Sequence, residues 1–523
     1  MVEKNLDVPA GHFPRRSFNR LIKKVRIARF AVFGRQPIIL IELIQNPPHQ
    51  IAVAHMVEAF RRQEAHRVVT YVDPAHTGLN RRQAFQQRAR HWIRSLSSSN
   101  SESTFRAMGA NQFIYPWFSA PQRKSASESA RVFFESDPTK QDVEALRLDG
   151  ILIGDLIYDD YLLKLRKGTV DPDSPQFREH LLESLKVFYF WKEFFQRHTV
   201  RGVIGNSVYR QALVSRIAIQ HGCDVFDAQV DRIVRLIGDG YQFEDTKYYS
   251  QEFNSRPDRG ELLEEAEQAL SEKRRGKPDM SNSHLANPSG LRSAHRLLAR
   301  SEKIKILIAP HCFSDSAHAF GPMLFSDFQG WLVFLAPIAR DSKYEWYLKP
   351  HPRGVDDLPL ITQIFAHCSN FTVLPHDASL SQLGEEGVSV ALTMRGHVGF
   401  DFPLMGIPVI SCTPGYRYRN YQFNLVPETT VEYANMLKDV ESLPENIHEN
   451  ELAEFYYMDT ILNHPNIIFP DSIGAQRQAK ALASDGILGV FVDAVDIRFV
   501  EETVGQLQNF IESRELRFRR LLV

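Results

Sequence analysis

The chain has 523 residues, 43% hydrophobic and 24% charged, a composition typical of a globular protein with more than one domain. Its 62 basic and 63 acidic residues nearly cancel, so the overall charge gives no support for nucleic-acid binding. Cys223, Cys312, Cys368 and Cys412 have no paired spacing, which argues against a disulfide framework or structural zinc and favours a reducing cytoplasm. The polar N-terminus predicts no signal peptide, and no apolar run predicts a transmembrane helix.

Residues 1–35 form a basic leader. Within 13–35, apolar residues recur three to four positions apart beside lysines and arginines, and no acid occurs between Asp7 and Glu42. This pattern predicts an amphipathic helix that either lies on an anionic membrane surface or packs on its own domain. The first alternative predicts a cytoplasmic protein held peripherally on the inner face of the cell membrane.

Residues 36–256 predict a first Rossmann-like domain, because short apolar strands alternate with helical segments. The segment Gly150–Tyr161 is expected to begin as a strand and to continue as a loop rich in carboxylates and tyrosines. The other expected elements are strands at 37–44, 68–72, 112–116, 202–204 and 223–226 and helices at 51–62, 81–94, 126–135, 175–198 and 208–221.

Residues 257–302 have a different composition, with a charged helix at 261–275 and a Pro/Ser/Asn-rich stretch at 277–293 that is typical of a linker. A second alternating series predicts a Rossmann-like domain at 303–480, followed by a helical segment at 481–523. Its expected elements are strands at 303–309, 344–348, 371–374, 388–393 and 409–411 and helices at 325–340, 356–367, 377–384 and 398–406.

Two strand ends of the second series carry residues suited to an anion. The strand at 344–348 is followed by Lys349 and His351, and the strand at 388–393 is followed by Arg395. Because ligands bind outside the carboxyl ends of parallel strands, we expect these three side chains to share a nucleotide-phosphate site.

The turn after Arg395 supports the same interpretation. Gly396 permits a close backbone approach, and the N–H groups of His397 and Val398 open the helix that follows, where an anion is favoured. The alternatives are that His351 only ends a strand and that the second motif is a surface turn.

Several segments resemble bacterial capsule and surface-polysaccharide glycosyltransferases of the GT-B type, including those that use CMP-Kdo or other CMP-activated nonulosonic acids. The segments that carry the resemblance are Ala309–His318, Leu348–Pro352, Gly396–Asp401 and Gly406–Ile410, and the similarity is firmest over 303–425. It implies two Rossmann-like domains facing a central cleft, with an N-terminal acceptor domain and a C-terminal donor domain. In that family His351 and Pro352 would form the His-Pro element that holds the nucleotide.

The resemblance also implies further site residues. Ser314, Asp315 and His318 follow the first strand of the second series, where such an enzyme meets its donor sugar, although a helix cap and turn would use the same residue types. Asp315, Asp155 and Asp159 are the candidates for the base that deprotonates an acceptor hydroxyl. No metal and no cofactor are expected beyond the nucleotide-activated sugar as substrate.

Three functions therefore remain open. The first is transfer of a sugar, Kdo or another nonulosonic acid from a CMP donor, to a glycan or glycolipid acceptor. The second is a nucleotide-sugar enzyme of the UDP-GlcNAc 2-epimerase type, which shares the plan of two domains. The third is a non-catalytic assembly protein of polysaccharide export.

Overall fold

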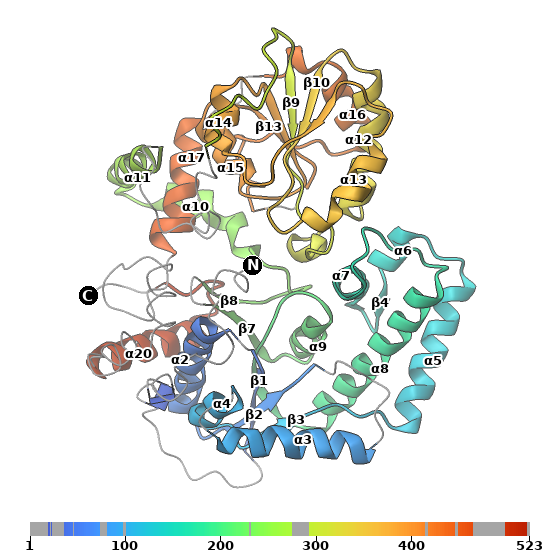
Figure 1. Cartoon of the computed structure of the whole chain (residues 1–523). Helices are drawn as coiled ribbons and strands as arrows, with labels where there is room; N and C mark the ends of the chain where they lie inside the picture. Colours follow the sequence, from blue (N-terminus) through green and yellow to red (C-terminus); the bar gives the residue numbers. More distant parts are fainter. Residues whose placement is uncertain are drawn as a thin grey trace. The chain divides into compact units, whose positions relative to one another are not determined.

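The computed structural model describes residues 19–20, 22–23, 36–44, 46–73, 81–97, 101–229, 232–274, 292–413, 417–444, 448–463 and 497–519 (Figure 1). Most of the basic leader, most of the expected linker at 277–293 and residues 464–496 lie outside these ranges. The described residues form two compact units. Unit 1 combines the residues up to Ile157, those of 172–242 and those from Asn463 onward, and unit 2 combines 158–171 with 243–462.

Unit 1 is built on a six-stranded sheet in the order β3-β2-β1-β6-β7-β8. All neighbouring strands are parallel except the pair formed by β7 and the edge strand β8. A separate antiparallel pair joins β4 to β5. The strands are β1 (Ile38–Glu42), β2 (Arg67–Tyr71), β3 (Gln112–Ile114), β4 (Arg147–Leu148), β5 (Ile151–Leu152), β6 (Val200–Ile204), β7 (Asp224–Ala228) and β8 (Ile233–Arg235).

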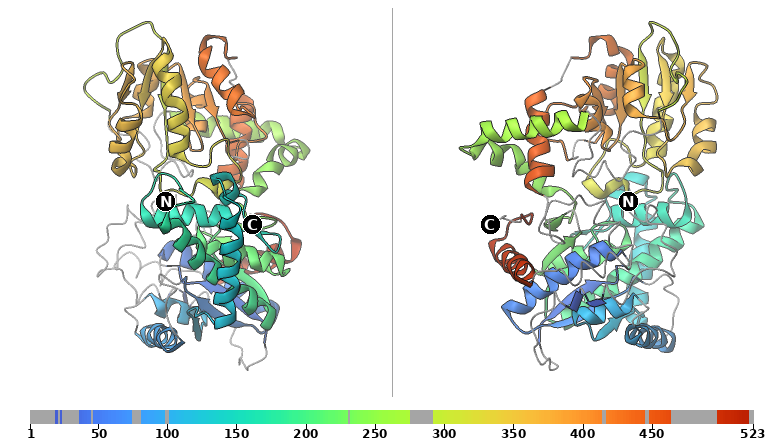
Figure 2. Two further views of the ribbon diagram at one scale, coloured as in Figure 1. Left: turned by 90° about the vertical axis from the view of Figure 1, so that its right-hand side faces the viewer. Right: turned by 60° about the vertical axis from the view of Figure 1, so that its left-hand side comes forward.

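Helices cover both faces of this sheet, because alternate strand residues point to opposite sides. Ile39 and Val68 pack in one core with α2, α4 and α20, whereas Tyr71 meets Trp191 of α8 edge-on at 5.2 Å between ring centroids. Figure 2 shows the C-terminal helix α20 beside α2. The helices are α2 (Pro47–Gln63), α3 (Arg81–Leu96), α4 (Glu102–Met108), α5 (Ala120–Glu135), α6 (Lys140–Glu144), α8 (Pro175–Arg197), α9 (Leu213–Gln220) and α20 (Ile497–Ser513).

Among the described residues of the basic leader, Asn19 and Ile22 are buried on unit 1, whereas Arg20 and Lys23 are exposed. Ile22 is fully buried in the same core, and the Asn19 amide donates a 2.6 Å hydrogen bond to the Ser103 hydroxyl and accepts one from Thr104 at 2.8 Å. These contacts place Asn19 and Ile22 against unit 1, while most of the leader lies outside the described residues, so both alternatives for it stay open. Nowhere in the described ranges is a helix both long and apolar enough to cross a membrane.

Unit 2 has a five-stranded, fully parallel sheet in the order β11-β10-β9-β12-β13. Its strands are β9 (Lys305–Ile308), β10 (Glu345–Leu348), β11 (Phe371–Val373), β12 (Val390–Thr393) and β13 (Val409–Ser411). Its helices are α10 (Tyr249–Ser255), α11 (Arg259–Arg274), α12 (Phe328–Asp341), α13 (Leu358–Ile364), α14 (Leu380–Glu385), α15 (Val398–Leu404), α16 (Thr430–Lys438) and α17 (Glu449–Tyr456).

The faces of this second sheet are again divided by strand alternation. Ile306 and Leu348 pack against α12, α13 and α16, whereas Leu307 and Tyr347 pack against residues of α14 and α15. The two Rossmann-like α/β units predicted from the sequence are thus confirmed, and so is the helix near the C-terminus.

The expected loop within Gly150–Tyr161 is wrong, because α7 (Gly154–Leu165) begins there. The carboxylates of this helix are paired; the buried Asp160, for example, forms an i,i+4 ion pair with Lys164 at 2.7 Å. Gly154 is the first residue of α7 and lies against the backbone of Val143. A Cβ at this position would lie only 1.8 Å from the Val143 carbonyl oxygen, so a larger residue would not fit there.

Asp327 connects this part of the chain to the rest of unit 2. As the N-cap of α12 it accepts a 2.6 Å hydrogen bond from the Gly330 N–H, and its other oxygen accepts bonds from the hydroxyls of Tyr158 at 2.5 Å and Thr169 at 2.6 Å. Tyr158 is fully buried, so its hydroxyl depends on this acceptor.

We therefore expect Asp327→Ala to lower the free energy of unfolding of unit 2 by about 2–4 kcal/mol, because it removes a cap and leaves a buried hydroxyl without its acceptor. The matched control is Thr429→Ala, which removes only the cap of α16 and should cost about 1 kcal/mol. Urea unfolding measures both variants, and equal losses would contradict the linking role of Asp327.

Candidate functional site

The strand order of unit 2 brings three loops to one place. β9 pairs with β10 on one side and β12 on the other, so the direction of strand addition reverses at β9. Ligands of open α/β sheets bind at such a switch point, outside the carboxyl ends of the strands. The loops that leave these ends begin at Ala309, Lys349 and Met394.

Two histidines from different loops stack at this position. The rings of His311, after β9, and His351, after β10, lie 5.3 Å apart and 21° from parallel. Burial, with a further contribution from His311, lowers the pKa of His351 to about 3. His351 is therefore a neutral imidazole at pH 7, able to donate one hydrogen bond without carrying charge.

Asp315 ties this histidine pair to Arg395. One Asp315 oxygen lies 3.2 Å from Nδ1 of His311 and 3.3 Å from a terminal nitrogen of Arg395. Burial alone would raise the pKa of Asp315, but Arg395 and His311 outweigh it and hold that pKa well below its ordinary value. Asp315 is thus a stable carboxylate that orients two cationic or hydrogen-bonding groups, and a poor proton acceptor near neutral pH.

Arg395 has an unused donor. Its guanidinium lies over the rings of Phe320 at 4.8 Å and Phe328 at 5.7 Å, and its side chain is only 4% exposed. Its buried Nε–H has no acceptor among the described residues. A buried N–H without an acceptor is costly, so an oxygen-rich ligand would improve this arrangement.

Gly396 lets the backbone pass beside His311. Its φ is +152°, and a Cβ at this position would lie 3.1 Å from Nε2 of His311. His397 then caps α15, and its carbonyl accepts from the N–H groups of Phe400 and Asp401, both at 2.8 Å. Burial, followed by the charges of Arg417 and Lys273, lowers the pKa of His397 to about 3. Val398, the first residue of α15, is half-buried.

Lys349 does not join this group. Its ammonium donates a 2.9 Å hydrogen bond to the carbonyl of His376, in the loop after β11, and burial lowers its pKa. Pro352 is exposed next to His351. Of the three side chains expected to share a site, His351 and Arg395 are brought together and Lys349 is turned toward the neighbouring strand.

Two further sequence-predicted residues of unit 2, Asp159 and His318, form a buried pair. Asp159 of α7 accepts from Nδ1 of His318 at 2.7 Å and from its backbone N–H at 3.0 Å. Burial raises the pKa of Asp159, with His318 and Arg395 acting in the opposite direction. Ser314, half-buried in the same loop, hydrogen-bonds the Cys312 side chain.

Asp155 lies in unit 1 and has a structural partner. Its two oxygens accept from the Arg216 guanidinium at 2.5 and 2.7 Å, and both side chains are 2% exposed. A buried, bidentate ion pair of this kind makes Asp155 unsuited to removing a proton from a substrate.

Two residues of interest were missed by the sequence analysis. His311 follows β9 as His351 follows β10, and the same strand-end rule would have found it. The second is Glu42, the last residue of β1, at the switch point of unit 1 where β1 pairs with both β2 and β6.

Glu42 has the properties of a general base. Its side chain accepts a hydrogen bond of 2.7 Å from the Asn206 N–H, which follows β6, and one of 3.5 Å from the hydroxyl of Tyr71, the last residue of β2. Burial is the main cause that raises its pKa to about 7, and the nearby charges of Asp73 and Asp227 add to the effect. A carboxylate with a pKa near neutrality at a strand-end crevice is a candidate functional group.

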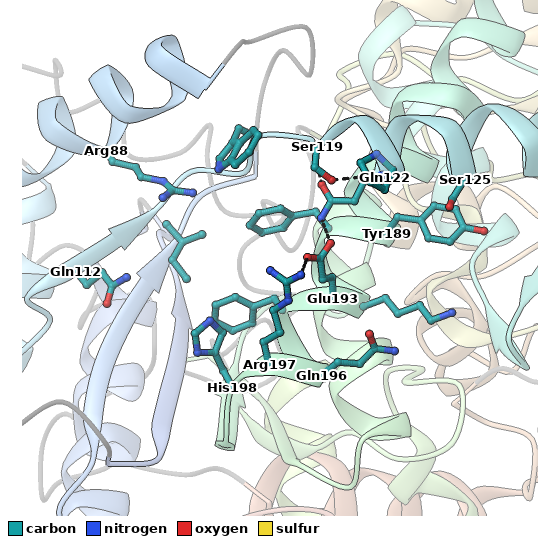
Figure 3. A pocket seen from close by; sticks show the side chains of 16 residues that line it. Arg88, Gln112, Ser119, Gln122, Ser125, Tyr189, Glu193, Gln196, Arg197 and His198 are labelled. Carbon is teal, nitrogen blue, oxygen red and sulfur yellow. Dashed lines mark hydrogen bonds and ion pairs between the residues drawn. The ribbon is translucent and has the colours of Figure 1, made fainter.

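A cavity of about 820 Å³ lies elsewhere in unit 1, between β3, α5 and the C-terminal half of α8. Figure 3 shows a hydrogen-bonded chain across it, in which Gln122 donates to Glu193 at 2.5 Å and Arg197 pairs with the same carboxylate. No residue predicted from the sequence lines this cavity. Across the described ranges no cluster of three or more His, Cys, Asp or Glu side chains could hold a metal ion.

The sequence matches no known family profile, and no curated protein matches it. Solved structures give weak similarities. A UDP-GlcNAc 2-epimerase from Neisseria meningitidis bound to UDP-GlcNAc is 11% identical, covers 80% of this chain and 96% of its own, and has a TM-score of 0.24.

Two glycosyltransferases are similar to the same degree. VinC in complex with dTDP is 11% identical over 91% of this chain and 100% of its own, with a TM-score of 0.22. A glycosyltransferase from Rickettsia africae ESF-5 is 9% identical over 92% of this chain and 100% of its own, with a TM-score of 0.24. Scores this low carry no conclusion about activity.

The pKa of Glu42 gives a test of the unit 1 crevice. Because the folded pKa, about 7, exceeds the ordinary value of 4.5, its contribution to stability is fully present below pH 4.5 and is lost as pH rises through 7. We expect Glu42→Gln to flatten the decline of the urea midpoint between these pH values. Glu179→Gln, an exposed change on α8, serves as control, and a wild-type slope in the Glu42 variant would contradict the assignment.

Proposed function

We propose that the chain is a nucleotide-sugar-dependent glycosyltransferase, in which unit 2 binds the donor and unit 1 binds a glycan or glycolipid acceptor. The observation that carries the proposal is the meeting of His311, His351 and Arg395 at the switch point of unit 2, with a buried Arg395 N–H that lacks an acceptor among the described residues. These donors are suited to binding an anion, and they lie at the switch point, where α/β sheets commonly bind nucleotides.

The chemistry of transfer needs such a site. When the bond between the anomeric carbon and the phosphate oxygen breaks, negative charge accumulates on the departing nucleotide. Donors that are already in place in a region of low water content stabilise that charge. Arg395 would offer a charged, planar donor, and the neutral His351 would offer a second hydrogen bond.

The specific donor and pathway rest on the sequence resemblance. The His-Pro element at His351 and Pro352 and the Gly396–Asp401 turn support a CMP-activated Kdo or other nonulosonic acid, added to a surface or capsular polysaccharide. A place on the inner face of the cell membrane through residues 13–35 stays a prediction, since nearly all of that segment lies outside the described residues.

Glu42 is the base that we propose for the acceptor hydroxyl. Among the expected candidates, Asp315 is held ionised by Arg395 and Asp155 is held by Arg216. Asp159 has a raised pKa but is paired with His318. Glu42 alone combines a pKa near 7 with a position at the strand ends of the proposed acceptor unit.

A nucleotide panel tests the donor site. We expect CMP to raise the melting temperature more than CDP, UDP or GDP, and Arg395→Lys to weaken CMP binding about tenfold or more, because an ammonium cannot both pair with Asp315 and replace the Nε–H donor. Arg292→Lys, at an exposed pair with Glu385, is the matched control.

Other outcomes of this panel favour other functions. If no nucleotide changes the melting temperature, the non-catalytic assembly protein becomes the better interpretation. If UDP-GlcNAc is converted without an acceptor, the chain is an epimerase.

The base is tested by the pH dependence of transfer. We expect wild-type kcat/KM to rise as pH increases through about 7, because the Glu42 carboxylate must be ionised to accept a proton. Glu42→Gln should remove this limb and lower kcat/KM by roughly a hundredfold or more. If Asp159→Asn lowered kcat/KM more than Glu42→Gln did, and the Glu42→Gln variant kept the rise of kcat/KM with pH, Asp159 rather than Glu42 would be the base.

A further inference from the structure

The surface helix α3 exposes its apolar side chains. Phe85, Trp92, Ile93 and Leu96 are 68, 45, 60 and 53% exposed, whereas the buried residues of the helix are the small Ala84 and Ser95. Phe85, Trp92 and Leu96 are separated by seven and four residues, so they form one line along the helix, with Ile93 beside it. This stripe, defined by these four residues, faces away from unit 1.

Such a concentration occurs nowhere else in the described part of the chain. The other exposed large apolar residues occur singly, no more than one to an element, as with Val132 on α5 and Val431 on α16. Isolated exposed apolar residues need no explanation, but a contiguous stripe marks an interaction surface.

Hydrogen bonds and an ion pair hold the inner side of the helix on unit 1, beside stacking of His91 on Phe113 and Tyr115. His91 and Arg94 both pair with the buried Glu102 of α4, at 3.0 and 2.7 Å. Arg88 donates to the Tyr115 carbonyl at 3.1 Å. Burial would raise the pKa of Glu102, but the bonds from His91 and Arg94 lower it to about 2, so the attachment persists across the physiological pH range.

The charged side chains on α3 itself are all basic. α3 contains no Asp or Glu, and Arg81, Arg82 and Arg90 are exposed on it. Arg106 of α4 lies over the Trp92 ring at 6.0 Å and adds a further cation beside the stripe. Glu102 of α4, which contacts the inner side of the helix, is buried and paired with Arg94.

We propose that α3 is the surface by which unit 1 lies on an anionic lipid bilayer. Phe85, Ile93 and Leu96 would enter the boundary between headgroups and acyl chains, Trp92 would sit at the interface, and the flanking arginines would contact lipid phosphates. The inference uses only unit 1 and holds whichever reaction the chain catalyses. It also differs from attachment through the basic leader, because α3 lies at residues 81–96 and the leader at residues 1–35.

The charges select lipid over the other possible occupants. In a twofold dimer through α3, the same arginines would meet one another across the interface, and like charges placed together cost free energy. A helix of another protein would need an acidic surface around an apolar line. A bilayer with anionic headgroups supplies both features at once.

The test is co-sedimentation of the full chain with vesicles of phosphatidylcholine alone and of phosphatidylcholine with phosphatidylglycerol. We expect binding to the anionic vesicles only, and Phe85→Ser with Ile93→Ser to weaken it about tenfold or more. Arg82→Gln with Arg90→Gln should weaken binding at low salt by a similar factor.

Matched controls separate the stripe from general effects. Val132→Ser with Val431→Ser removes exposed apolar residues elsewhere, and Lys124→Gln with Arg300→Gln removes exposed charges elsewhere. Both should bind like the wild type. Wild-type binding in both α3 variants would overturn the proposal, as would a concentration-dependent dimer that the Phe85 and Ile93 changes abolish while no variant binds vesicles.

Discussion

The parallel pairing of a central strand with neighbours on both sides is the constraint on which the site depends. β1 in unit 1 and β9 in unit 2 each hold this position. Right-handed crossovers then carry the chain to one side and afterwards to the other, so the loops after the central strand and its two neighbours meet at one edge. Glu42 and Asn206 meet for this reason, as do His311, His351 and Arg395.

At the two switch points the pKa of a buried carboxyl group is shifted in opposite directions. Asp315 has a guanidinium and an imidazole beside it, and its pKa is driven down despite burial. Glu42 has acids for neighbours and one backbone donor, so burial dominates and its pKa rises to about 7. The first arrangement holds Arg395 and His311 in place around an ionised carboxylate, and the second gives a carboxyl group with a pKa near neutrality.

Much of the fold could be predicted from the sequence, because short apolar strands that end at polar or Gly-containing turns are unambiguous. The same rule correctly located His351 and Arg395 at strand ends. It could not give side-chain direction, which is why Lys349 was expected beside them and instead reaches the His376 carbonyl. Long-range pairing was also out of reach, since Asp159 is separated from His318 by 159 residues.

Helix α3 illustrates a second limit. Its spacing of Phe85, Trp92 and Leu96 predicts a helix correctly, but amphipathic spacing alone does not say which side faces the protein. An apolar stripe would ordinarily be assigned to the core. In α3, His91 and Arg94 bind the buried Glu102 on the inner side of the helix. The apolar side is therefore not the side that packs on unit 1. The outer side of α3 has four large exposed apolar residues and no acid. A helix that only contacts water would ordinarily carry acidic as well as basic residues on this side and few large apolar ones. Charge composition and burial together, rather than periodicity, support the proposal that this face contacts an anionic lipid surface.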